Sequence, residues 1–139
     1  MINFEIGGYY FKNGERVQLI PIEMPTITDL NNYLDILKIN NGKLILRNDL
    51  EDEFMPYEMV LYSDNHETLI HIYMILFATD MEDGDIEVRT FNDESGSKEF
   101  IPMLGEPFAI ASTTKNFSLV IQAFKEFLET GDVSRDLLS

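Results

Sequence analysis

Short apolar, β-prone runs separated by polar turns make up most of this 139-residue chain, and they favour folds built on an antiparallel sheet. The first two runs, Phe4 to Phe11 and Arg16 to Ile22, flank Asn13 and Gly14, a pair that suits the positive φ angles of a type I′ hairpin turn. Further runs cover residues 43–47, 55–62, 69–77, 86–91 and 100–104, with polar turns expected at 63–67, 80–85 and 92–97. This order predicts consecutive antiparallel strands.

Two segments have helical periodicity instead. The first has Thr28 as a plausible N-cap and is expected to end near Asn41 and Gly42. Its apolar face is Leu30, Tyr33, Leu34 and Leu37. The second is the clearest element of the chain, with Gly131 placed to end it and an apolar stripe of Phe117, Val120, Ile121, Phe124, Phe127 and Leu128. We therefore predict one α+β domain over residues 1–139: an antiparallel sheet meander with two main helices, the C-terminal one packed on the sheet.

Charge is the most informative number in the composition. The chain has 25 acids and 10 bases, a net charge of −15, and the stretch from Asp49 to Glu99 holds 15 of the acids and only two bases. Such a surface repels phosphate backbones, so we expect no nucleic-acid binding and favour a basic protein partner. The candidate partner-binding residues are Glu51, Asp52, Glu53, Asp80, Glu82, Asp83 and Asp85. The alternative is that these acids only keep the protein soluble.

The candidate metal-binding and catalytic motifs lack the spacing or the environment that their chemistry requires. His66 and His71 are five residues apart, whereas the zinc-protease motif needs an i, i+4 pair on one helical face. A loop starting at Asp80 lacks the glycine and glutamate that an EF-hand requires at its sixth and twelfth positions. Asp83 and Asp85 lie in a polar turn, where neither carboxyl would gain the raised pKa of a general acid. We therefore predict no catalytic residue, no metal ligand and no cofactor, and not an enzyme.

Other features bear on location and on binding. There is no apolar stretch long enough to span a membrane, no signal-peptide pattern and no cysteine, so we expect a cytoplasmic protein without disulfides. Gly7 and Gly8 within the first run suggest a bulge or a close approach of backbones. The tyrosines Tyr9, Tyr10, Tyr57, Tyr62 and Tyr73 are candidates for an interface, although packing is the commoner role.

The order of several segments resembles small bacterial immunity proteins of polymorphic toxin and contact-dependent growth inhibition systems. The segments are residues 13–17, 30–37, 42–46, 88–91, 102–107 and 124–138, of which the last, with its helix, Gly-Asp-Val turn and final leucines, carries most of the resemblance. The resemblance implies a protein that binds and neutralises a cognate toxin domain, commonly a nuclease, and it carries over no functional residue. Two alternatives remain open: a small metal-dependent hydrolase that uses the acidic loops, and an acidic nucleic-acid mimic. The oligomeric state and the identity of the toxin are not predicted.

Overall fold

The structure, a computed structural model, describes residues 3–49, 55–66, 70–93, 97 and 99–139. The elements in chain order are β1 (Phe4–Lys12), β2 (Glu15–Glu23), α1 (Ile27–Ile39), β3 (Gly42–Asn48), β4 (Pro56–His66), β5 (Ile70–Asp80), β6 (Ile86–Arg89), β7 (Phe100–Met103), β8 (Glu106–Ala109), the 3-10 helix η1 (Ile110–Ser112), β9 (Thr113–Thr114) and α2 (Phe117–Thr130). No helix among these residues is long and apolar enough to cross a membrane.

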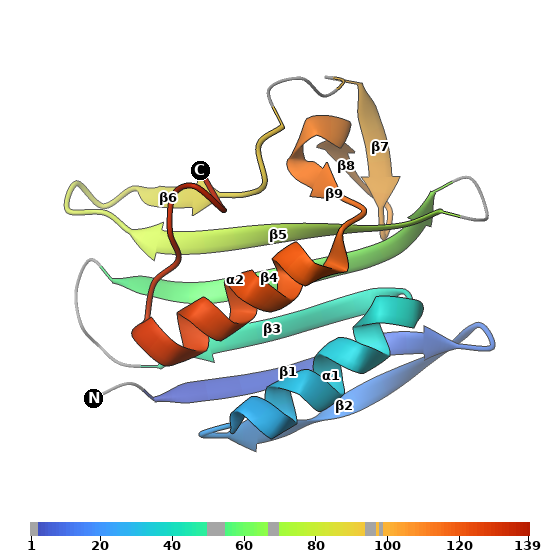
Figure 1. The fold of residues 1–139 in the computed structure, drawn as a ribbon, viewed down its shortest axis with the longest axis horizontal. Coiled ribbons are helices and arrows are strands. Elements are labelled where there is room, and N and C mark those ends of the chain that lie inside the picture. The colour runs from blue at the N-terminus through green and yellow to red at the C-terminus, as the bar shows by residue number, and fades with distance from the viewer. Residues whose placement is uncertain (1–2, 50–54, 67–69, 94–96, 98) are drawn as a thin grey trace.

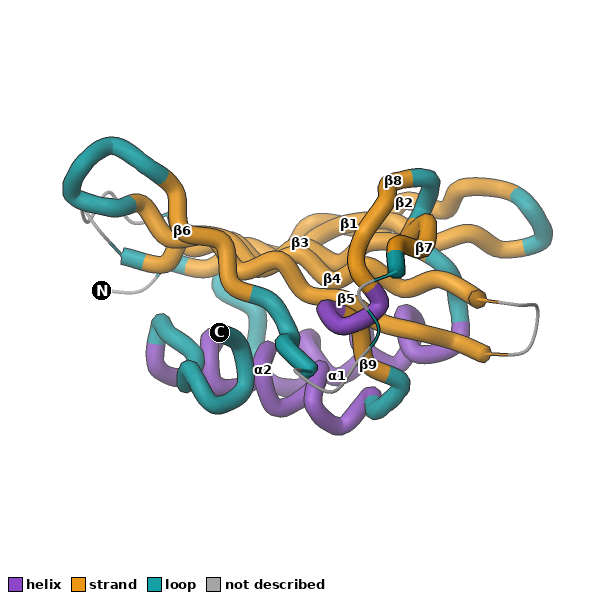
Figure 2. Tube along the Cα trace, turned by 90° about the horizontal axis from the view of Figure 1, so that it is seen from above, coloured by secondary structure: helices purple, strands orange, loops and turns teal. Residues whose placement is uncertain are grey.

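The main sheet has the order β2-β1-β3-β4-β5-β6, with every pair antiparallel and the short β9 pairing with β5. Strands β3 to β6 follow one another as the predicted meander, while α1 separates the β1–β2 hairpin from β3 (Figure 1). Both helices lie on the same face of the sheet (Figure 2). The α+β class and the packing of the C-terminal helix on the sheet are therefore confirmed.

The main core lies between the sheet and the two helices. Alternate residues of the strands point toward the helices, because side chains in a strand alternate between its two faces. Phe127 of α2 is fully buried, with its ring centroid 4.8 Å from that of Phe4 and 4.9 Å from that of Phe77, both edge-on. These edge-to-face aromatic contacts join both halves of the sheet to α2.

The other face of the sheet, which we call the outer face, is covered only in part. There the β7–β8 hairpin covers a second, smaller core that contains Tyr62, Ile72 and Met74 of the sheet together with Ile101 and Met103 of β7. The sequence pattern predicted another meander strand at 100–104. The strand itself is present as β7, but its place in the meander was wrong, since among the described residues β7 pairs with β8 alone and forms a separate two-stranded sheet.

The predicted ends of the first helix also need correction. The N-cap is Thr26 and not Thr28: the Thr26 hydroxyl accepts from the Asp29 backbone N–H, and the Asp29 carboxylate accepts from the Thr26 N–H, which is a capping box. At the other end the helix stops at Ile39, and Gly42 is already the first residue of β3. Thr28 was a reasonable N-cap by residue type, but the reciprocal pair needs an acid three residues after the cap.

Glycines near the start of β1 allow the backbones of β1 and β3 to approach closely, as the sequence suggested. The β1–β2 register shifts between Ile6 and Gly8, and Gly8 has φ of 142°. A Cβ atom on Gly8 would overlap the carbonyl oxygen of Lys43, and a Cβ on Gly42 would overlap that of Tyr9. Gly8 of β1 and Gly42 of β3 therefore each leave room for the backbone of the other strand. Both have positive φ values, which disfavour residues other than glycine.

Candidate functional site

The acidic turn between β5 and β6, residues 80–85, is held by its own backbone. Met81 N–H donates to the Asp85 carbonyl at 2.9 Å, and Gly84 N–H donates to the Met81 carbonyl at 3.1 Å. Gly84 has φ of 87°, a conformation that glycine adopts readily. The Asp83 carboxylate accepts from the Asp85 N–H at 3.0 Å. The turn is thus a defined structure at one end of the molecule (Figure 1).

The carboxylates of this turn point into solvent. Asp80, Glu82, Asp83 and Asp85 are all exposed, and within the described part of the chain none of them forms an ion pair. Exposed carboxylates of this kind offer negative charge to a partner. The other predicted cluster, Glu51, Asp52 and Glu53, lies outside the described residues. Over the described ranges no three histidine or acidic side chains converge as a metal site would require.

Next to the acidic turn, the outer face of the sheet carries a continuous row of apolar side chains. Cross-strand pairing places Ile45 beside Val60 and Val60 beside Leu76, and it places Ala78 beside Val88. We call this row the outer strip: Ile45, Val60, Leu76, Ala78, Val88 and Ile86. The residues from Ile45 to Ala78 are half-buried, and Val60 and Leu76 among them pack against the core under the β7–β8 hairpin. Val88 is 53% exposed and Ile86 is 56% exposed. Asp80 pairs directly with Ile86, so the strip ends at the acidic turn.

Charged and aromatic side chains lie on both sides of the outer strip. On one side of the strip Arg47 forms an ion pair with Glu58 across β3 and β4. On the other side Lys43 stands between Tyr9 and Tyr62 in the pairing register, with its Nζ 4.5 Å from the Tyr62 ring centroid. Both arrangements hold cations against partners within the protein. These two basic side chains are therefore already engaged, unlike the carboxylates of the acidic turn.

The tyrosines that the sequence suggested for an interface are divided between the two faces. Tyr9 is half-buried on the outer face, with the Arg16 guanidinium 3.8 Å from its ring centroid, whereas Tyr10 packs against the main core. Tyr62 and Tyr73 are buried, and burial raises the pKa of both. A buried phenol with a raised pKa has a packing role, so these two do not form a binding surface.

The buried Ser63 hydroxyl and the half-buried His71 imidazole form a pair that the sequence did not reveal. Ser63 Oγ lies 2.5 Å from His71 Nε2 and 2.6 Å from the Leu37 carbonyl oxygen at the end of α1. The carbonyl can only accept, so Ser63 donates its proton there and the neutral imidazole donates from Nε2 to Ser63. Burial lowers the pKa of His71, against an opposing effect of the Asp64 carboxylate. Because Ser63 is fully buried and its proton is used, the pair caps α1 and is not a nucleophile with its base.

The same pair explains why the predicted turn at residues 63–67 was wrong. Strand β4 continues to His66, and both Ser63 and Asp64 make specific contacts from it. Ser63 caps the Leu37 carbonyl on the helix side, while the Asp64 carboxylate accepts from the Leu104 N–H at 2.8 Å on the outer side. Polar residue types alone suggested a turn, but here tertiary hydrogen bonds satisfy them inside a strand.

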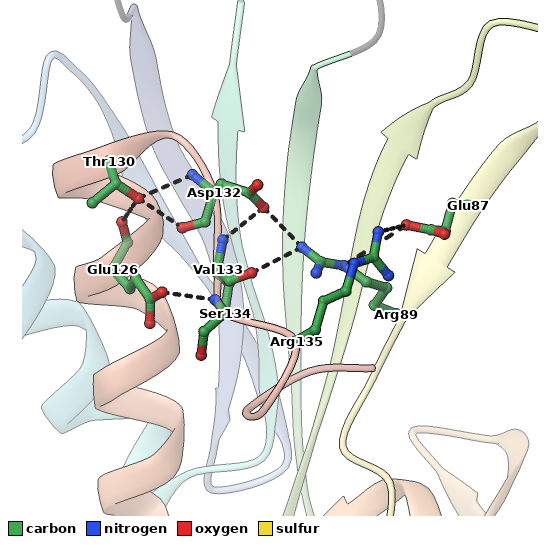
Figure 3. A network of polar contacts seen from close by, with 8 residues as sticks. All are labelled: Glu87, Arg89, Glu126, Thr130, Asp132, Val133, Ser134 and Arg135. Atoms are coloured by element: carbon green, nitrogen blue, oxygen red, sulfur yellow. Dashed lines mark hydrogen bonds and ion pairs between the residues drawn. The ribbon is translucent and has the colours of Figure 1, made fainter.

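A second network fixes the C-terminal segment to β6 (Figure 3). Arg89 is only 3% exposed; its Nη2 lies 2.8 Å from Asp132 Oδ1 and 3.2 Å from the Val133 carbonyl oxygen. Its guanidinium also lies 4.8 Å from the Phe77 ring centroid. Beside it, Glu87 Oε1 accepts a hydrogen bond from Arg135 Nη2 at 2.8 Å. These bonds hold β6, and therefore one arm of the acidic turn, against the end of the chain.

The sequence did contain a signal for part of this arrangement. Arg89 is one of only two bases between Asp49 and Glu99, so an isolated cation in that stretch could have suggested a specific carboxylate partner. The alternation of Ile86 and Val88 with Glu87 and Arg89 could likewise have suggested two different faces. Only the structure shows which face the helices cover.

Comparisons with known proteins give a family and a fold but no activity. Residues 3–137 match the sequence profile of a family described as "Family of unknown function (DUF6911)". No curated protein matches the chain. Among solved structures, the chain is similar to the crystal structure of a hypothetical protein from Neisseria gonorrhoeae, with a TM-score of 0.79 and 28% sequence identity over 96% of this chain and 92% of that one.

Proposed function

The chain belongs to the family of unknown function DUF6911, and we propose from its own surface that it is a stoichiometric inhibitor of a basic protein domain. In this proposal it acts as immunity proteins act: it binds a cognate toxin domain, which we take to be a nuclease, and blocks that domain's surface. The inhibition consists of binding alone, with no chemical step by this chain.

The observation that carries the proposal is the acidic turn. Four exposed carboxylates stand within six residues at the tip of the β5–β6 hairpin, and the described structure pairs none of them with a cation. Like charges held this close repel one another, and no cation in the described structure offsets the repulsion. A basic partner would offset it, through attraction that is felt over about 10 Å at 0.1 M salt.

The net charge of −15 makes a toxin that acts on nucleic acid the best-matched partner. A nuclease needs lysine and arginine side chains to replace the counterions of its substrate, so its active surface is basic. An acidic protein can cover that surface and exclude the substrate by direct competition. This electrostatic reasoning and the resemblance of the sequence to immunity proteins support the same function.

Growth rescue tests the proposal. If a secreted protein with a variable C-terminal domain is encoded immediately upstream of this chain, that domain is the probe, expressed in a bacterium with or without this chain. We expect the domain alone to arrest growth, and co-expression with the chain to restore growth through a one-to-one complex. Arrest that persists although both proteins are made and folded would overturn the proposal, as would the absence of a complex between the purified proteins.

A further inference from the structure

We propose that the outer strip and the acidic turn form one docking surface, and that its occupant is an apolar side-chain cluster ringed by lysine and arginine on a protein partner. This inference rests on the proposed function and names the surface that carries it. The strip provides the apolar centre, and the carboxylates of residues 80–85 provide the charged rim.

Among the described residues, little covers the apolar part of the surface near β6. The two helices lie against the opposite face of the sheet, and the β7–β8 hairpin lies on the outer face (Figure 2), where its core packs against Val60 and Leu76 in the middle of the strip. From there the strip runs toward β6, where Ile86 and Val88 are each more than half exposed. Two β-branched apolar residues on the open face of an edge strand are a feature that monomeric proteins usually avoid.

The negative charge beside the strip indicates which kind of partner can bind there. Asp80 lies directly beside Ile86 in the pairing register, so any surface that covers Ile86 must also approach the carboxylates of the turn. A second copy of this chain would bring two such turns together, each on a molecule of charge −15. Like-charge repulsion disfavours that pairing, whereas a basic rim on the partner complements the carboxylates.

The surface is also held in place before any partner arrives. Arg89 follows Val88 and points to the opposite face, where its bonds to Asp132 and to the Val133 carbonyl tie β6 to the C-terminal segment. Binding to a preformed surface avoids the entropy cost of ordering a loop. Because Arg89 is covered by the chain itself, it positions the strand and does not contact the partner.

The first test uses a synthetic amphipathic helix of leucine and lysine as a probe of known chemistry, titrated into the isotope-labelled full chain and followed by NMR. We expect amide shifts to concentrate at residues 76–88 and on Ile45 and Val60. Shifts that concentrate on α1 and α2, or no shifts at all, would overturn the docking surface.

Paired charge variants sharpen this test. The double variant Ile86→Lys and Val88→Lys should weaken peptide binding at least about tenfold, because it removes the apolar contact and repels the probe. The control is Ile20→Lys with Ile39→Lys, which adds the same charge at two residues that are each 76% exposed and lie away from the strip. All four side chains are mostly exposed, so both variants should fold. Equal weakening in both would leave only a general charge effect and would refute the surface.

Growth rescue separates this inference from the proposed function. If the parent and the control variant relieve growth arrest but the Ile86 and Val88 variant does not, both proposals are supported. If all three relieve it, the inhibitor function stands and the surface is wrong. If the peptide maps to the strip but no protein relieves arrest, the surface stands and the inhibitor function is wrong. Light scattering tests one further outcome. If the parent is a dimer and the Ile86 and Val88 variant is a monomer, the occupant is a second copy of the chain and the basic partner is overturned.

Discussion

Arg89 on β6 and Asp132 after α2 are 43 residues apart in the chain, yet the Nη2 of one lies 2.8 Å from the Oδ1 of the other. The arginine side chain is 4% exposed and the aspartate side chain is 61% exposed, so a buried cation is neutralised by a carboxylate at the surface. This long-range contact therefore helps to hold the C-terminal segment against β6, the strand that follows the acidic turn.

Removing the Asp132 carboxylate should be costly because it leaves the buried guanidinium with the more distant Glu87, whose Oε1 lies 4.0 Å from Arg89 Nε, as its counter-charge in the described structure. We expect Asp132→Ala to lower the free energy of unfolding by about 1–3 kcal/mol in urea denaturation. The double variant Arg89→Met with Asp132→Ala should be less destabilised than Asp132→Ala alone, since methionine can fill the site beside Phe77 without a charge. Asp136→Ala, an exposed acid of the same segment, serves as the control and should change stability little.

The Ser63–His71 pair predicts a specific pH dependence. Burial lowers the pKa of His71 below its ordinary value of about 6.5, despite the opposing charge of Asp64. At pH values between the folded-state and the unfolded-state pKa of His71, the unfolded chain binds more protons than the folded one. The contribution of His71 to stability should therefore be fully present above about pH 6.5 and should be lost as the pH decreases toward the folded-state pKa. Tyr73, whose ring lies 5.1 Å from the imidazole, has a pKa raised by burial and stays neutral over this range.

The measurement is the difference in unfolding free energy between the parent and His71→Gln, followed from pH 7.5 to pH 5. Glutamine keeps an N–H donor for Ser63 but does not titrate, so the carboxylates common to both proteins cancel in the difference. A difference that is constant with pH would show that the imidazole titrates alike in both states. An imidazole pKa above 6.5, observed by NMR in the folded parent, would contradict the sign of the effect.

Adjacent glycines in β1 provide a matched pair of variants. Gly8→Ala should destabilise by about 1–3 kcal/mol or more, because φ is positive there and the new Cβ would overlap the Lys43 carbonyl oxygen. Gly7→Ala should be tolerated, since the atoms nearest to a Cβ at that position are 3.9 Å and 4.0 Å away. Thermal unfolding of the two variants compares them directly, and equal melting temperatures would show that the backbone at Gly8 can relax.

The acidic turn should act mainly on the rate of association. Replacing Asp80, Glu82, Asp83 and Asp85 with asparagine or glutamine should slow association with the cognate toxin domain and flatten its salt dependence. Folding should be little affected, because exposed like charges mainly repel one another. Stopped-flow or surface-plasmon measurements at several salt concentrations test this. If the rate and the salt slope match those of the parent, the charge of this turn serves solubility.

Much of the framework could be predicted because it depends on local signals. Asn13 and Gly14 have the positive φ angles that the hairpin turn required, and Gly131 ends α2 in the left-handed conformation. The stripe on α2 is buried at Phe117, Val120, Phe124 and Phe127. Hydrophobic period and turn chemistry are properties of a few neighbouring residues, so a sequence can specify them without reference to the rest of the fold.

The surface that we propose as a docking site was decided by tertiary structure alone. The sequence identified the acids of residues 80–85, but it could not show that the outer strip ends beside them. Nor could it show that Ser63 and Arg89 are buried, because each is satisfied by a partner 26 and 43 residues away, respectively. Cross-strand neighbours and the choice of which sheet face the helices cover depend on how distant segments pack. The residue type determines how favourable the burial of a side chain is, and the rest of the chain determines whether that side chain is buried.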